Sequence, residues 1–179
     1  MRLIVIEGCD GTGTTTHTQS LVYNLREEGY SATEFHHPPP PNGCSPWTRV
    51  THYASERSKL VDRWGDSETV VVADRWHYST RVFSAIVEDA LRHRLLELAR
   101  LEELTLPAPL MAVVLDASDV ELDRRLTKRG EPLRATDALQ RHAYRHVVGP
   151  QVGTILNTGQ DKDAVRNLLL HMAVSAINK

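Results

Sequence analysis

A glycine-rich segment between a short apolar run and a helical pattern constrains this chain more than any other feature. Residues 3–6 are apolar on both faces of a predicted strand, and residues 8–16, with the sequence GCDGTGTTT, follow it directly. Small residues let the backbone turn tightly, so that its N–H groups point into one concavity. These donors, together with the positive end of the helix predicted next, are suited to phosphate oxygens. The segment therefore predicts an α/β fold with a phosphate-binding loop after the first strand.

The rest of the chain alternates strand-sized apolar runs with helical patterns. This alternation implies right-handed crossovers and a parallel sheet. Its 179 residues, of which 41% are hydrophobic and 25% charged, fit one globular domain over 1–179. We therefore predict a three-layer fold with a five-stranded parallel sheet and helices on both faces. The predicted strands are 3–6, 32–35, 70–73, 111–115 and 154–156, and the predicted helices are 15–28, 47–64, 79–104, 120–128, 136–148 and 161–178.

Charge and cysteine content narrow the class of protein. Lys and Arg number 21 against 23 Asp and Glu, and this net charge of −2 disfavours a protein that holds duplex nucleic acid by charge. No apolar run approaches the length of a membrane span. Cys9 and Cys44 have no metal-ligand or redox spacing, which fits a reducing cytoplasm. We expect a cytoplasmic protein whose partners are small phosphorylated molecules, since a few arginines suffice to hold them.

One position of the loop departs from the phosphate-binding pattern. The P-loop motif G-x-x-x-x-G-K-[ST] has a lysine where this chain has Thr14. Thr15 occupies the position whose hydroxyl meets Mg²⁺ in such loops. Taken alone, the segment could also be a glycine-rich turn that binds no nucleotide.

Several segments in succession resemble the thymidylate kinases, a family of P-loop nucleoside monophosphate kinases. Their order and spacing cover nearly the whole chain, which makes the resemblance far more specific than the loop alone. It implies a P-loop kinase domain with a lid at about 124–137. The matching segments are IEGCDG at 6–11, HHP at 36–38 where many members have R-E-P, YASER at 53–57 for F-A-A-D-R, DRWHYSTRVF at 74–83 for D-R-[aromatic]-x-x-S-x-x-A-[YF], and RRLTKRG at 124–130 for the arginine-bearing lid.

The resemblance implies transfer of the γ-phosphate of ATP to dTMP, giving dTDP, with Mg²⁺ as cofactor. It also implies a homodimer formed through the helices near 47–64 and 79–104. The implied ATP-binding residues are Gly8, Asp10, Gly11, Thr12, Gly13, Thr14, Thr15 and Thr16. The implied catalytic residues are Asp10, Arg75, Arg129 and Arg134, and the implied Mg²⁺ ligands are Thr15, Asp10 and Asp74.

For the acceptor, the resemblance implies stacking of Tyr53 on the base and a hydrogen bond from Arg57 to a pyrimidine carbonyl. The two residues stand four apart, so one helix face can present both. Arg75 is suited to grip the acceptor phosphate with its forked guanidinium. Without the family resemblance, Tyr53 would be interpreted as a core residue and Arg57 as a solvated one. For Asp74 and Arg75, the alternative to a role at the site is a structural ion pair at the edge of the sheet. The implied acceptor residues are Phe35, Tyr53, Arg57, Asp74, Arg75, Ser79, Thr80 and Phe83.

Departures from the family pattern keep two alternatives open. Besides Thr14, the chain has His36 and His37 where an arginine is usual, and Tyr53 in place of phenylalanine. One alternative is a kinase for another or a modified deoxynucleoside monophosphate, and the other is a degenerate homologue that binds nucleotide without catalysis. For an active enzyme we expect the lid arginines, Arg129 or Arg134, to supply the charge of the missing lysine.

Overall fold

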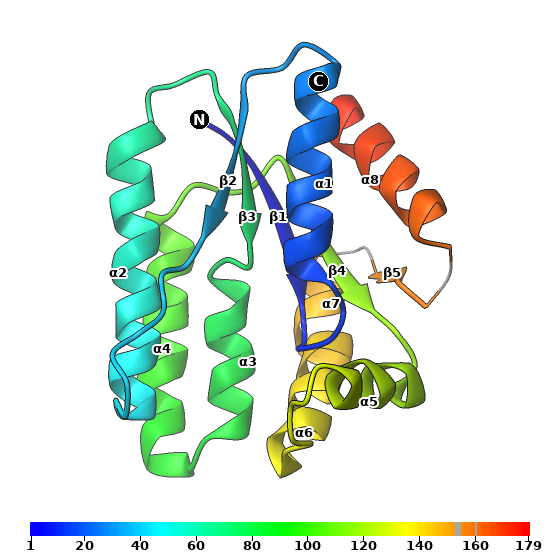
Figure 1. The fold of residues 1–179 in the computed structure, drawn as a ribbon. Helices are drawn as coiled ribbons and strands as arrows, with labels where there is room; N and C mark the ends of the chain where they lie inside the picture. The colour runs from blue at the N-terminus through cyan, green and yellow to red at the C-terminus, as the bar shows by residue number, and fades with distance from the viewer. Residues whose placement is uncertain (153–154, 160) are drawn as a thin grey trace.

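A five-stranded parallel sheet forms the centre of the molecule (Figure 1). The computed structural model describes residues 1–152, 155–159 and 161–179. The strands are β1 (Arg2–Gly8), β2 (Ala32–His36), β3 (Val70–Asp74), β4 (Met111–Asp116) and β5 (Ile155–Asn157), in the order β2-β3-β1-β4-β5. All four ladders are parallel, so the predicted fold class is confirmed. Residue 154, predicted to begin the fifth strand, lies outside the described residues.

The helices match the predicted pattern except at two breaks. They are α1 (Thr14–Glu27), α2 (Pro46–Trp64), α3 (Tyr78–Ile86), α4 (Asp89–Thr105), α5 (Asp119–Lys128), α6 (Ala135–Ala143), the π-helical η1 (Tyr144–Val148), α7 (Gly149–Val152) and α8 (Lys162–Ile177). The helix predicted over 79–104 is interrupted because Val87 and Glu88 are extended, and Arg92 donates to the carbonyls of Ser84 and Val87 across the break. The helix predicted over 136–148 widens into a π-helix at Tyr144.

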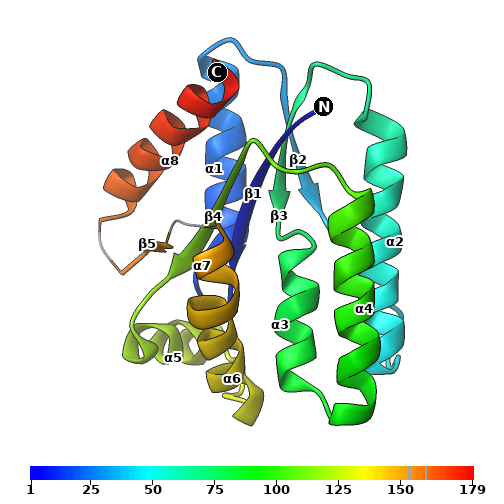
Figure 2. The same ribbon diagram turned by 180° about the vertical axis from the view of Figure 1, so that it is seen from behind.

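Helices cover both faces of the sheet because β1 is apolar on both sides (Figures 1 and 2). Ile4 and Ile6 pack in one core with residues of α1 and α8. Leu3 and Val5 point the other way and pack in a second core with residues of α2 and with Trp76. Successive residues of β1 therefore anchor opposite layers, as the two-residue period of a strand requires.

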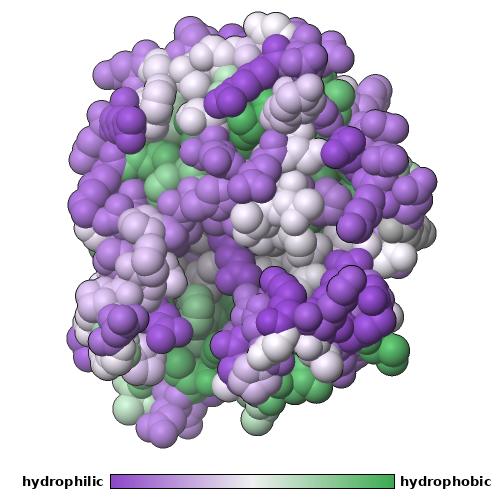
Figure 3. All heavy atoms as spheres, viewed as in Figure 1, coloured by the Kyte–Doolittle hydropathy of each residue, from purple (hydrophilic) through white to green (hydrophobic). Residues whose placement is uncertain are grey.

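The carboxyl ends of the strands meet at one edge of the sheet, which lies lowest in Figure 1. The loop after β1, the turn between β3 and α3, and the segment around α5 and α6 gather there. In the space-filling view, hydrophilic residues surround a hollow on this side of the molecule (Figure 3). Such an edge is where ligands bind in open α/β sheets. Among the described residues, no helix combines the length and apolarity needed to cross a bilayer.

Close packing at the end of β1 makes a first prediction about Gly8. A Cβ at this position would lie 2.8 Å from the carbonyl oxygen of Leu115 in β4. Because that oxygen belongs to the sheet backbone and cannot easily move, Gly8→Ala should lower the free energy of unfolding by about 2–3 kcal/mol, the upper part of the range for overpacking, in urea denaturation.

Gly29→Ala is the control for this prediction, because Gly29 has a φ of +86° but open space around its Cβ position. It should cost about 1–2 kcal/mol from backbone strain alone, so its loss should be the smaller of the two. A larger loss for Gly29→Ala would contradict the close-packing argument.

Candidate active site

The loop after β1 leaves the N-terminus of α1 open for an anion. Gly13 caps α1 in the left-handed conformation, with a φ of 88°, and contributes no side chain that would occupy the first N–H groups of the helix. The Thr12 hydroxyl donates to the carbonyl of Cys9 at 2.8 Å and closes the loop on itself. Unpaired N–H groups at a helix N-terminus, with the helix dipole behind them, favour phosphate.

Three cavities surround this loop, and we name each by its position. The loop cavity, about 280 Å³, is lined by Cys9, Asp10, Gly11, Gly13, Thr14, Thr15, Thr16, Arg75, Arg129, Glu131 and Arg134. The β3 cavity, about 460 Å³, is lined by Asp10, Thr14, Thr15, His36, His37, Arg49, Tyr53, Arg57, Asp74, Arg75, Ser79, Phe83, Arg134 and Gln140. The α5 cavity, about 400 Å³, is lined by Gly11, Thr12, Gly13, Thr16, His17, Ser20, Glu121, Arg124, Arg125, Lys128, Arg129, Thr158, Lys162, Asp163 and Arg166.

The loop cavity shares walls with the other two. The loop and β3 cavities have in common Asp10, Thr14, Thr15, Arg75 and Arg134. The loop and α5 cavities have in common Gly11, Gly13, Thr16 and Arg129. The predicted phosphate loop therefore lies between two larger cavities, an arrangement that can bring two ligands to one place.

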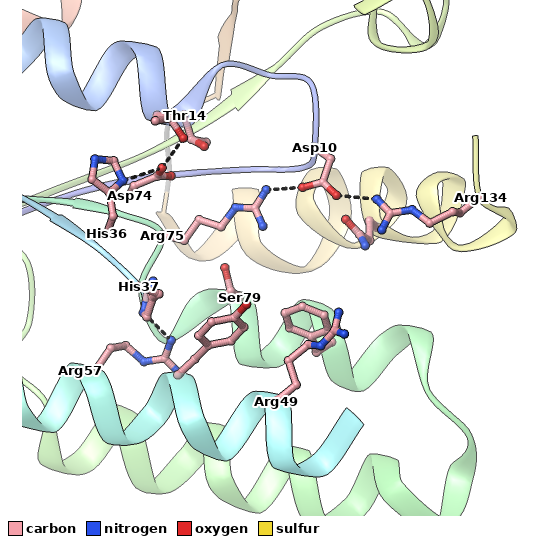
Figure 4. A pocket seen from close by; sticks show the side chains of 14 residues that line it. Asp10, Thr14, His36, His37, Arg49, Arg57, Asp74, Arg75, Ser79 and Arg134 are labelled. Carbon is pink, nitrogen blue, oxygen red and sulfur yellow. Dashed lines mark hydrogen bonds and ion pairs between the residues drawn. The ribbon is translucent and has the colours of Figure 1, made fainter. Parts of the chain in front are cut away.

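Asp10 joins two of the predicted catalytic arginines (Figure 4). Arg75 donates from Nη2 to its Oδ1 at 2.7 Å, and Arg134 donates from Nη2 to its Oδ2 at 2.6 Å. Burial alone would raise the pKa of Asp10, but the two guanidiniums outweigh it and hold that pKa below its usual value. Both carboxylate oxygens are thus occupied by cations. The predicted role of Asp10 as a metal ligand stays a prediction; in this structure its oxygens pair with Arg75 and Arg134.

Thr15 and Asp74 form a second polar cluster beside the loop. The Thr15 hydroxyl donates to Asp74 Oδ2 at 2.5 Å, and His36 Nδ1 lies 3.1 Å from the same oxygen. A hydroxyl and a carboxylate are the oxygen donors that suit Mg²⁺, which keeps several waters and completes its shell with substrate phosphates. The described residues contain no cluster of three His, Cys, Asp or Glu side chains that could hold a metal without such help. Thr15 and Asp74 therefore fit Mg²⁺ only with other ligands present.

Arg57 lies deeper than predicted, with 2% of its surface exposed. Its Nε donates to Glu102 at 2.7 Å, its Nη2 donates to the Thr80 hydroxyl at 3.0 Å, and its Nη1 lies 3.1 Å from His37 Nε2. Burial and the charge of Arg57 lower the pKa of His37 to about 3, so a neutral ring accepts that third bond. Arg57 still lines the β3 cavity, but these partners occupy donors that we expected to face a base.

The other predicted acceptor residues form two groups, one that lines the β3 cavity and one that packs against neighbouring side chains. Tyr53, Ser79 and Phe83 line the β3 cavity. The Thr80 hydroxyl donates to Glu102 at 2.7 Å with 1% of the residue exposed, and Phe35 packs edge-on against the Trp76 ring. Neither Thr80, which is buried, nor Phe35, which is partly buried, lines the β3 cavity, and their predicted contact with substrate stays a prediction.

Sequence reasoning assigned no role to several residues that the structure brings to the site. Arg49 and Gln140 line the β3 cavity. Arg49 stands four residues before Tyr53, one helical turn away, so the helix period could have identified it. Gln140 lies on α6, just beyond the predicted lid, and none of the matched segments includes it. Glu7 belongs to the IEGCDG segment, but no role was predicted for it; in the structure its side chain is fully buried.

The turn that carries Arg75 is unusual in its backbone. Arg75 has a φ of 71° and is the one non-glycine residue with positive φ in the part of the chain that the structure describes. Strained backbone of this kind persists only where the surroundings hold it, and often at functional sites. Directly after it, the Trp76 N–H donates to Glu7 Oε1 at 2.7 Å. Burial raises the pKa of Glu7 to about 7, although this hydrogen bond and one from Ser79 oppose the rise.

The lid segment predicted at about 124–137 comprises the end of α5, a connecting turn and the start of α6. Arg125 is held firmly there: it donates to the carbonyls of Gly11 and Thr158 at 3.0 and 2.7 Å and to Glu121 at 2.7 Å. Arg129 is half-exposed and pairs with Glu131 at 3.2 Å. The α5 cavity collects six cationic side chains against two acidic ones, which suits a polyanionic ligand.

Two comparisons relate the chain to kinases that act on nucleosides or nucleotides. The thymidylate kinase of Chlamydia felis (strain Fe/C-56) is 30% identical over 105 residues, which cover 48% of this chain and 50% of that protein. The chain thus spans about half the length of this curated relative. The structure of deoxyadenosine kinase from M. mycoides with bound dATP matches with a TM-score of 0.70 and 14% identity, over 99% of this chain and 100% of that chain.

The chain shares its fold with a deoxynucleoside kinase. At 14% identity this likeness extends to the fold alone, while the partial sequence match supports a relationship to nucleotide kinases. No protein-family model matches the chain. The acceptor therefore has to be argued from the site itself.

The buried carboxyl of Glu7 predicts how stability depends on pH. Between its ordinary pKa of 4.5 and its folded value of about 7, the folded protein retains a proton that the unfolded chain has released. This group's contribution to the free energy of unfolding should therefore fall as pH rises from 5 to 8, by roughly 1.4 kcal/mol for each pH unit between the two pKa values.

Glu7→Gln removes this titration, so its stability relative to wild type should improve between pH 5 and pH 8 in urea denaturation. Glu68→Gln, which replaces a carboxyl with 88% of its side chain exposed, is the control and should show no such trend. A Glu7→Gln difference that stays constant with pH would contradict the prediction.

Proposed function

We propose that the protein is a nucleoside monophosphate kinase that transfers the γ-phosphate of ATP to dTMP, giving dTDP. The observation that carries the proposal is the loop cavity, which shares wall residues with a larger cavity on each side. Phosphoryl transfer requires two phosphates in line, with positive charge around the transferred group, and little covalent chemistry from the protein. The loop cavity meets the charge requirement, since Arg75, Arg129 and Arg134 all line it, and the walls it shares with the other two cavities support the approach of one phosphate from each side.

The donor binds with its phosphate chain on the loop and the remainder of ATP in the α5 cavity. Loop N–H groups and the N-terminus of α1 hold the β- and γ-phosphates. Arg124, Arg125 and Lys128 add positive charge on the donor side. Thr15 and Asp74 would hold Mg²⁺, which neutralises charge on the phosphate oxygens when bound.

The acceptor binds in the β3 cavity with its phosphate toward Arg75. The forked guanidinium of Arg75 is suited to a phosphate, which would compete with Asp10 for its donors. Tyr53 and Phe83 provide aromatic surface for a base and a sugar. The match to a thymidylate kinase supports a pyrimidine acceptor.

One observation favours an alternative acceptor. Arg57 directs its donors to Glu102, Thr80 and His37, so base recognition depends on the few donors that remain and on His37, Arg49 and Gln140. A different or modified deoxynucleoside monophosphate is therefore the second candidate. The structural likeness to a deoxyadenosine kinase is compatible with that alternative.

In this proposal, arginines of the lid supply the positive charge that a lysine in the P-loop would otherwise provide. Thr14 offers a neutral hydroxyl, a weaker partner for phosphate than an ammonium. Arg134 lines both the loop and β3 cavities, where donor and acceptor phosphates would meet, whereas Arg129 lines the loop and α5 cavities. Arg134 is thus the better placed of the two to follow charge during the transfer. If neither arginine supplies this charge, the protein is a degenerate homologue that binds nucleotide without catalysis.

The acceptor assignment predicts a preference that an ADP-release assay measures with dTMP, dUMP, dAMP and dGMP. Turnover should be fastest with dTMP, and Arg75→Ala should reduce it by about 10²–10³-fold, the usual loss when a charge-stabilising donor is removed. Arg81→Ala is the matched control, because Arg81 lies on α3, pairs with Glu103 and lines none of the three cavities. Equal rates with all four acceptors would refute dTMP specificity, and absence of ADP release would refute the kinase.

If lid arginines replace the P-loop lysine, removing charge from the lid and adding charge at Thr14 should have different effects on turnover. Arg134→Ala should lower kcat by about tenfold or more and change KM for ATP far less, because the charge acts in the transition state. Thr14→Lys should then raise kcat only modestly, whereas Arg100→Ala on the exposed side of α4 should change neither constant. Unaffected lid variants together with a gain of about 10²-fold from Thr14→Lys, roughly 2.7 kcal/mol, would mean a degenerate kinase.

A further inference from the structure

The turn between β3 and α3 is held from beneath by one buried carboxylate. Arg75 donates its backbone N–H to the carbonyl of Ile6 at 2.9 Å, and the left-handed conformation then directs the next N–H, that of Trp76, into the interior. Glu7 Oε1 accepts that N–H at 2.7 Å. The Trp76 side chain is completely buried, so the turn is fixed on both sides of Arg75.

The second oxygen of Glu7 holds two further segments. It accepts a hydrogen bond from the Ser79 hydroxyl in α3 at 2.9 Å and one from the Tyr144 hydroxyl in η1 at 3.2 Å. Ser79 and Tyr144 also lie within hydrogen-bond distance of each other, at 2.9 Å. A single carboxylate therefore joins the end of β1, the start of α3 and the π-helix that continues from the lid helix α6.

Stability alone does not account for a carboxylate at this position. Glu7 has no exposed surface, and none of the hydrogen bonds to its oxygens comes from a cationic group. Burying such a group is unfavourable, and an apolar side chain of similar volume often serves stability better. Glu7 nevertheless occupies the position that satisfies the N–H following the strained residue. The Arg75 side chain, which the same turn carries, points to Asp10 (Figure 4).

We propose that Glu7 is a positioning residue for phosphoryl transfer, and that it acts by holding Arg75 in the left-handed conformation from which its guanidinium reaches the loop cavity. The role rests on the proposed function, because Arg75 is assigned there to the acceptor phosphate. Without the carboxylate, the Trp76 N–H is left in the interior without its acceptor. The backbone at Arg75 then relaxes toward ordinary φ values, and the guanidinium no longer lies between Asp10 and the acceptor phosphate.

The first test reads the turn directly, without reference to activity. Amide hydrogen exchange of Trp76, relative to that of Val5 within β1, is measured in the whole protein for wild type, Glu7→Gln and Glu7→Leu. Relative exchange of Trp76 should rise about tenfold or more in Glu7→Leu and by an intermediate factor in Glu7→Gln, whose amide oxygen is a weaker acceptor. Unchanged relative exchange in Glu7→Leu would overturn the proposal.

Two controls separate the turn from general loss of stability. Tyr144→Phe removes another donor to the same carboxylate, and Glu102→Gln alters a second buried carboxyl that pairs with Arg57. Both should leave the relative exchange of Trp76 within about twofold of wild type, and an equal rise in all variants would overturn the proposal. If Glu7→Leu does not fold, Glu7→Gln decides: a rise of about threefold supports the role and no change overturns it.

The second test is a double-mutant cycle between Glu7 and Arg75. In the wild-type background, Glu7→Leu should lower kcat/KM for dTMP by about tenfold or more and leave KM for ATP within about twofold. In the Arg75→Ala background, the same substitution should change kcat/KM for dTMP by less than about twofold, because its effect passes through Arg75. Equal factors in both backgrounds would overturn the proposal.

Failure of the kinase assignment gives a different result from failure of this inference. If wild type transfers no phosphate to any acceptor, the proposed function fails, and binding of inorganic phosphate replaces kcat/KM in the cycle. The positioning role would still be supported if Glu7→Leu weakened phosphate binding in the wild-type background but caused no additional loss in the Arg75→Ala background. Equal losses in both backgrounds would again overturn it.

Discussion

The buried carboxylate of Glu7 is the interaction on which the geometry of the site depends. It accepts hydrogen bonds from Trp76 and Tyr144, which lie 69 and 137 residues further along the chain. Burial removes this carboxyl group from water and raises its pKa to about 7, and the hydrogen bonds from Trp76, Ser79 and Tyr144 oppose that rise by favouring the ionised form. One polar side chain at the end of β1 therefore contacts both the Arg75 turn and the helical segment after the lid, and it fixes their relative positions. The apolar packing of β1 against both helical layers supports the same arrangement from the sides.

The positive charge around the phosphate loop comes from arginines on other segments of the chain. Asp10 accepts from Arg75 in the turn after β3 and from Arg134 at the N-terminal cap of α6. The loop itself has Thr14 where a lysine is usual, so the cations near it are arginines supplied by other segments. An arginine offers a planar fork of donors rather than a point charge, so its placement depends on the backbone that carries it. The left-handed turn at Arg75 is the clearest instance of that dependence.

Sequence reasoning about the site succeeded where the spacing was local. Asp74, Arg75, Ser79 and most of the loop residues were predicted from contiguous motifs, and the structure places them around the β3 and loop cavities; the exceptions are Gly8 and Thr12. It was less successful for Arg57, whose neighbours on other elements could not be read from helix spacing. Glu102 and His37 approach it from α4 and from the end of β2, and they occupy donors that were expected to face a ligand. The homodimer implied by the family resemblance stays a prediction.

The sequence by itself determined the order of strands and helices, the parallel sheet and the loop that ends β1, because these follow from apolar periodicity and from glycines within a few residues of one another. The break between α3 and α4 is accompanied by local hydrogen bonds from Arg92, whereas Tyr144 of the π-helix, Asp10 and Arg57 contact residues far away in the chain. Hydrogen bonds between residues far apart in the chain leave no periodic trace in the sequence. Only the tertiary structure decided that Asp10 faces two arginines, that Arg57 lies buried against Glu102, and that Glu7 lies beneath the Arg75 turn.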